Sequence, residues 1–127
     1  MLRRSKKDRE LDGAIRELAG ADTLAFGGVG IASTLLPVTE AYQQVEQALA
    51  EQPDGMRRRL DWLLDHGSPA GRAYAATLLG RIDPAAARAA WTSMRTDERE
   101  FTTFSGCVMG RTTLREYATD RLDAPAS

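Results

Sequence analysis

The chain holds one cysteine, Cys107, and one histidine, His66. A thiolate becomes a nucleophile when a nearby base, cation or helix N-terminus lowers its pKa, so one candidate activity is that of a thiol-dependent enzyme using Cys107. Free cysteine more often packs as a small buried hydrophobe, and we expect Cys107 to be buried in this way. His66 precedes Gly67 at an expected helix end, where a protonated imidazole interacts favourably with the helix dipole.

One cysteine and one histidine are too few for the usual zinc site of Cys and His ligands. The glycine run Gly27-Gly28-Val29-Gly30 lacks the Gly-Lys-Ser/Thr that completes a phosphate-binding loop, because Ile31-Ala32-Ser33 follows it. We therefore expect no metal and no cofactor, and we interpret the glycine run as a tight, close-packed turn.

A compact basic group followed by tryptophan is the best candidate for a contact surface. Arg58 precedes Trp62 by one helical turn, so its guanidinium could stack on the indole ring. Tryptophan and arginine are enriched at binding hot spots. We predict a protein-binding surface made of Arg58, Arg59, Trp62 and Asp65.

Two other interpretations of this segment stay open. The triplet Arg57-Arg58-Arg59 has aspartates around it, so it is also compatible with a solvated face that carries weak ion pairs. Trp62 is also compatible with burial against the expected helix that carries Tyr42.

The first ten residues, MLRRSKKDRE, include five basic and two acidic residues. One hypothesis is that Arg3, Arg4, Lys6 and Lys7 bind nucleic acid or a membrane surface. The formal net charge of the chain is −1, whereas nucleic-acid-binding proteins are typically strongly basic. We therefore do not expect nucleic acid as a partner. We interpret residues 1–7 as a flexible basic terminus.

A length of 127 residues is typical of one domain, and we assign 1–127 to a single helical domain with a tail at 123–127. No stretch approaches the ~20 apolar residues of a membrane span, and no apolar run follows the basic start as in a secretion signal. We therefore expect a soluble, cytoplasmic protein. Lys6 and Lys7 are the only lysines, and this arginine bias is typical of a GC-rich bacterial genome.

Apolar residues recur at helical spacing along most of the chain. We expect helices over Asp8 to Ala19, Pro37 to Gln52, Met56 to His66, Pro69 to about Ile82, Pro84 to about Arg95 and Thr113 to Leu122. Two glycine-containing segments between them, Ala21 to Leu36 and Thr96 to Gly110, are expected to be irregular loops. In the second loop, we expect the apolar side chains to anchor the chain to the core: Phe101, Phe104, Val108 and Met109.

The helix that follows Ser68 is apolar nearly all round. Ser68 and Pro69 form a cap-plus-proline start signal, and Asp83-Pro84 repeats that signal. One face carries Tyr74 and several leucines, while small residues that allow close helix approach line the other. Such a helix must be covered on two sides, so we predict that it lies in the middle of a stacked helical array.

The segment from Met56 to about Met94 resembles HEAT-type helical repeats. The residues that carry this resemblance are Pro69, Arg72, Ala75 or Ala76, Leu79, Gly80, Ile82, Asp83 and Pro84. The order FGGVGIAS, SPAGRAYAATLLGRIDPAA and FSGCVMG also looks like a group of small bacterial helical proteins, which implies an architecture and no catalytic residue. The expected fold is therefore all-α, with HEAT-like stacked helical hairpins, five to seven short helices and two irregular loops.

Packed helical arrays present rigid surfaces suited to a protein partner. The leading hypothesis is a non-catalytic protein-interaction module of bacterial origin, such as an adaptor or an immunity-type binding protein.

Overall fold

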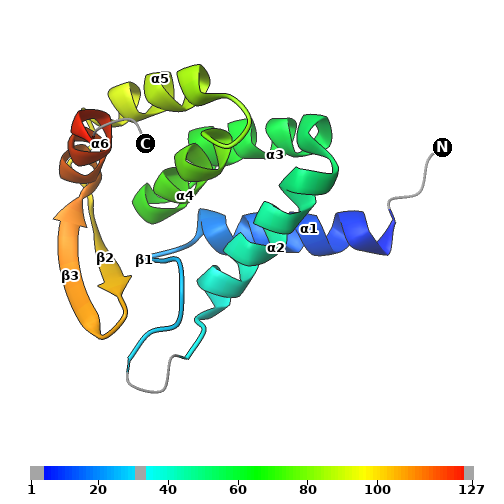
Figure 1. Cartoon of the computed structure of the whole chain (residues 1–127), viewed down its shortest axis with the longest axis horizontal. Helices are drawn as coiled ribbons and strands as arrows, with labels where there is room; N and C mark the ends of the chain where they lie inside the picture. The colour runs from blue at the N-terminus through cyan, green and yellow to red at the C-terminus, as the bar shows by residue number, and fades with distance from the viewer. Residues whose placement is uncertain (1–4, 31–33, 125–127) are drawn as a thin grey trace.

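The centre of the protein is helix α4 (Pro69–Leu79), which the computed structural model surrounds with other elements (Figure 1). The structure describes residues 5–30 and 34–124. Ser68 caps α4 through its Oγ, which accepts a hydrogen bond from Gly71 N at 3.1 Å, and Pro69 occupies the first turn. The helix packs against α1, α3, α5 and α6 and against two strands, so the prediction of a covered middle helix is confirmed.

The described part of the chain contains five further helices. Three of the six helices have Ser, Asp or Thr caps at positions that the sequence marked, including Asp83 before α5 and Thr113 before α6. The first helix starts at Lys6, two residues earlier than expected, because Ser5 accepts a hydrogen bond from Asp8 N at 3.1 Å. The helices are α1 (Lys6–Ala19), α2 (Pro37–Glu51), α3 (Pro53–His66), α5 (Pro84–Met94) and α6 (Leu114–Asp123).

A three-stranded sheet makes the all-α prediction wrong. Strands β2 (Glu100–Ser105) and β3 (Val108–Thr113) form an antiparallel hairpin where a loop was expected, and β1 (Thr23–Ala25) pairs in parallel with β2. The segment is rich in threonine and aromatic residues, which favour strands. Gly106 adopts a φ of +62° in the two-residue turn with Cys107, as a tight hairpin turn requires.

The strand geometry also corrects the expected core contacts of the hairpin. Phe101 is buried and Phe104 is half-buried, but Val108 and Met109 are 70% and 66% exposed. The reason is that β3 is an edge strand and both residues lie at its start, near the turn, whereas Phe101 lies toward the other end of β2 and packs on Tyr117 of α6.

Close packing by glycine occurs at Gly71 rather than in the glycine run. A Cβ at Gly71 would overlap the Leu18 carbonyl oxygen, so glycine allows α4 to approach α1. A Cβ at Gly27 or Gly30 would meet no atom within 4 Å, so the expectation of a close-packed turn is wrong there. Gly30 adopts a φ of +72°, and its N–H donates to the Gly106 carbonyl oxygen at 3.1 Å. Ile31-Ala32-Ser33 lies outside the described residues.

The Tyr74 hydroxyl forms hydrogen bonds with the backbone groups on the outer edge of β1. It accepts a hydrogen bond from Ala25 N at 2.8 Å and donates to the Ala25 carbonyl oxygen at 3.0 Å. The buried Thr39 hydroxyl donates to the same carbonyl at 2.8 Å. Tyr74 and Thr39 thus fix β1 to α4 and α2.

We predict that Tyr74→Phe destabilises the protein by about 1–3 kcal/mol, because the variant leaves the buried Ala25 N–H without a partner. Urea denaturation followed by circular dichroism measures this change. Tyr117→Phe is the matched control, because the Tyr117 hydroxyl makes no hydrogen bond within the described residues. Equal stability of Tyr74→Phe and the wild type would contradict the role of the hydroxyl.

Burial raises the pKa of Tyr74 from 10.0 to about 12. An unfolded chain therefore releases this proton before the folded one does, so stability falls as pH rises from 10 to 12. We expect a shallower fall in the Tyr74→Phe variant, measured as the urea midpoint against pH.

Candidate functional site

A cleft between α1 and α3 holds three of the four residues predicted to bind a protein. It has a volume of about 360 Å³. Its lining residues come from α1 and α3: Asp12, Ile15, Arg16, Arg58, Arg59 and Trp62. The fourth predicted residue, Asp65, is exposed on α3 but does not line this cleft. The fold therefore joins the predicted surface to residues of α1 that the sequence analysis did not connect with it.

Trp62 is exposed and its ring is held in place by its neighbour. The residue is 43% exposed, and its indole stacks on the His66 ring with centroids 4.8 Å apart and an interplanar angle of 14°. His66 Nδ1 also lies 3.0 Å from the Trp62 carbonyl oxygen. The alternative in which Trp62 packs on α2 is wrong, because Trp62 faces the cleft that α3 forms with α1. His66 occupies the last turn of α3, as predicted.

The three consecutive arginines have different environments. Arg59 Nε donates to Asp12 Oδ1 at 3.0 Å, and its Nη2 lies 3.5 Å from Asp8 Oδ1. Arg57 pairs with Asp83 at 2.9 Å, and this ion pair joins α3 to the start of α5. Arg57 and Arg59 are therefore held by contacts within the chain, and Arg59 links α3 to α1 while it lines the cleft.

Arg58 and Arg16 provide the accessible positive charge of the cleft. Both are exposed, and within residues 5–30 and 34–124 neither has an ion-pair partner. The cleft thus combines two accessible guanidinium groups with an exposed indole. The guanidinium groups can form charge-assisted hydrogen bonds to carboxylates, while the indole provides apolar contact area.

The expected burial of Cys107 is wrong. The residue is exposed in the two-residue turn between β2 and β3, where it extends beyond the packed part of the sheet. Among the described residues no group forms a hydrogen bond to its sulfur, and His66 is engaged with Trp62. Within residues 5–30 and 34–124, no base is therefore in hydrogen-bond contact with the Cys107 thiol.

The structure describes two of the four residues named in the basic N-terminal hypothesis, Lys6 and Lys7. Arg3 and Arg4 lie outside the described part of the chain. Lys6 lies 4.0 Å from Glu10, and Lys7 pairs with Glu51. Intrachain glutamates therefore accompany both lysines.

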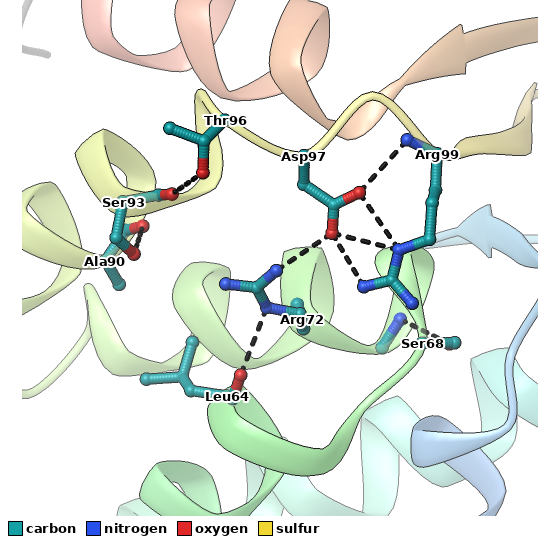
Figure 2. A network of polar contacts seen from close by, with 9 residues as sticks. Leu64, Ser68, Arg72, Ala90, Ser93, Thr96, Asp97 and Arg99 are labelled. Carbon is teal, nitrogen blue, oxygen red and sulfur yellow. Dashed lines mark hydrogen bonds and ion pairs between the residues drawn. The ribbon is translucent and has the colours of Figure 1, made fainter.

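A second polar cluster centres on Asp97 and was missed by sequence analysis (Figure 2). Asp97 accepts hydrogen bonds from Arg99 Nη2 at 2.6 Å and from Arg72 Nη1 at 2.9 Å. Arg72 Nε also donates to the Leu64 carbonyl oxygen at 3.1 Å, so the cluster joins α3, α4 and the segment before β2. The hydrogen bonds from Arg99, together with the charge of Arg72, lower the pKa of Asp97 to about 2. A carboxylate with such a low pKa supports structure and is a poor general acid at neutral pH.

Comparisons with protein-family models, curated proteins and solved structures found no match. Within the described residues, no group of three or more His, Cys, Asp or Glu side chains is arranged to hold a metal ion. None of the described helices is long and apolar enough to cross a membrane.

We predict that Asp97→Asn removes part of the acid sensitivity of folding. In the wild type, the folded pKa of about 2 lies below the ordinary 3.8, so this carboxylate stabilises the fold above pH 4 and loses its effect as pH falls toward 2. We expect a loss of about 1–2 kcal/mol at pH 7, given that Arg99 is exposed to solvent screening.

Denaturation curves from pH 2 to pH 7 measure this effect. Glu98→Gln is the matched control, because Glu98 is exposed and, among the described residues, pairs with the exposed Arg115. A pH dependence that Asp97→Asn leaves unchanged would contradict the role assigned to Asp97.

Proposed function

We propose that this chain is a non-catalytic protein-interaction module whose partner binds in the cleft between α1 and α3. The observation that supports this most is Trp62, a large apolar side chain that is 43% exposed at the cleft. Exposed tryptophan beside accessible arginine is the composition typical of binding hot spots. The indole would supply apolar burial, while Arg58 and Arg16 would contact polar or acidic groups around it.

The local structure supports a low entropic cost of binding. Stacking on His66 restricts the rotation of the Trp62 side chain before any partner arrives. The Arg59–Asp12 hydrogen bond, in turn, holds α3 next to α1, so the two sides of the cleft have a fixed separation. A surface that is already ordered loses less conformational freedom when it binds.

The helical framework supports the same role by analogy. Consecutive helices pack on each other, α3 on α4, α4 on α5 and α5 on α6, as in arrays of helical hairpins. In the proposal these pairs are HEAT-like, and the module acts in a bacterium as an adaptor or an immunity-type protein that tethers or blocks its partner. The adaptor or immunity role is inferred by analogy, because helical arrays commonly bind partner proteins through their surfaces.

We predict that Trp62→Ala and Arg58→Ala each weaken partner binding by about tenfold or more, and that the double variant abolishes capture of the partner. Affinity capture from the native lysate identifies the partner, and calorimetry with the purified partner measures the dissociation constants. Arg95→Ala is the matched control, since Arg95 is exposed at the C-terminal end of α5 and does not line the cleft.

Circular dichroism of each variant separates lost binding from lost folding. In the wild type, Trp62 is exposed whereas Trp91 is 6% exposed, so acrylamide quenches mainly Trp62 emission. Partner binding is expected to protect that emission from quenching. Unchanged affinity in the folded double variant would refute the placement of the partner in this cleft.

A further inference from the structure

The two edges of the sheet differ in how their backbone groups are satisfied. The strand order is β1-β2-β3, so β1 and β3 are the edge strands. Tyr74 and Thr39 bind the outward-facing groups of Ala25 on β1. No strand of the described chain pairs with the outer side of β3, which lies on the outside of the molecule (Figure 1).

The hairpin register identifies the unpaired groups on β3. Ser105 and Val108 flank a two-residue turn, so they form a hydrogen-bonded pair, and such pairs alternate with non-hydrogen-bonded ones along an antiparallel ladder. Met109 lies opposite Phe104, and Arg111 lies opposite Thr102, both in the non-hydrogen-bonded class. The N–H and C=O groups of Met109 and Arg111 therefore point away from β2, toward the open edge.

The hydrogen bonding between β2 and the segment of β1 supports this assignment of the open groups. Thr102 N, which must point away from β3 in the same alternation, donates to the Asp22 carbonyl oxygen at 3.0 Å. The assignment of the open groups thus follows from the pairing on both sides of β2.

The side chains on β3 leave this edge unprotected. Native edge strands are commonly guarded by lysine, proline or a bulge. β3 has the sequence VMGRTT and a continuous register with β2, and it contains none of these features. Its one charged side chain, Arg111, donates to Thr102 Oγ1 at 3.1 Å and so lies along β2 instead of blocking the edge.

We propose that a second copy of the chain pairs with β3 in antiparallel orientation, about a two-fold axis at Gly110. Met109 of each copy then lies opposite Arg111 of the other, and the four outward-facing groups on each side give four backbone hydrogen bonds. The two arginines do not face each other across the axis. Val108 and Thr112 face each other as a β-branched pair, which favours strand pairing.

The product is a continuous six-stranded sheet built from two copies. Isologous two-fold pairing of this kind is the commonest arrangement in soluble oligomers. The proposal does not depend on the proposed function, because the cleft between α1 and α3 lies on elements away from β3 (Figure 1). In the dimer both clefts stay accessible, so the assembly would present two Trp62 sites.

Sedimentation velocity at protein concentrations from about 5 to 200 µM tests for the dimer. This range suits weak association, because a single pair of strands makes a small interface. We expect the wild type to shift from monomer to dimer across this range. Arg111→Pro removes an outward N–H and places a ring at the interface without breaking a bond to β2, so it should weaken dimerisation at least tenfold. Arg111→Ala, the matched control, keeps the N–H and should dimerise like the wild type.

A wild type that stays monomeric at the upper concentration would overturn the proposal, and so would dimerisation of folded Arg111→Pro with wild-type affinity. Amide hydrogen exchange of the wild type gives a test that needs no variant. The amides of Met109 and Arg111 should become protected only at high concentration, whereas the Thr102 amide should be protected throughout because it is bonded within the chain. Protection of Met109 and Arg111 that does not change with concentration would count against the dimer.

Discussion

The Tyr74 hydroxyl provides the contact on which the arrangement of sheet and helices depends. A three-residue strand such as β1 has few backbone groups with which to hold its position, and β2 binds it on one side only. On the other side, one hydroxyl group acts as both donor and acceptor for Ala25, and the Tyr74 ring packs against both Phe26 and Tyr42, which also contact each other. Because Tyr74 comes from the most buried helix, the position of the sheet is tied to the centre of the core.

The helical part of this structure could be predicted because its signals are local. Ser68-Pro69 and Asp83-Pro84 each combine a capping side chain with a residue whose φ suits the first helical turn, and both helices start where these signals lie. The hairpin also had a local signal, since threonines and phenylalanines flank Gly106-Cys107, but apolar residues near a glycine are equally compatible with a loop. The pairing of β1 with β2 had no local signal, because it joins Thr23 to Thr102.

The candidate site could be located from the sequence but not resolved into roles. The spacing of Arg58 and Trp62 placed both on one face of a helix, and they line one cleft. Which arginine is accessible depends on Asp8 and Asp12 of α1, which pair with Arg59 where α3 packs on α1. Such contacts between distant segments are fixed by packing, so three arginines in a row acquire different environments.

The charge of the cleft follows from the same contacts. The whole chain has a formal net charge of −1, so no positive surface is expected from composition. Arg59 engages aspartates of α1 and Arg57 engages Asp83, so these carboxylates interact with arginines that serve the fold. Arg58 and Arg16 keep their charge accessible beside Trp62, and a nearby carboxylate of a partner would meet two cations in a partly enclosed cleft where water screens them less than on an open surface. Under the proposed function, the selectivity of the cleft would arise from how the fold distributes its ion pairs, and a change to an internal partner such as Asp12 would alter the cleft as directly as a change to Arg58.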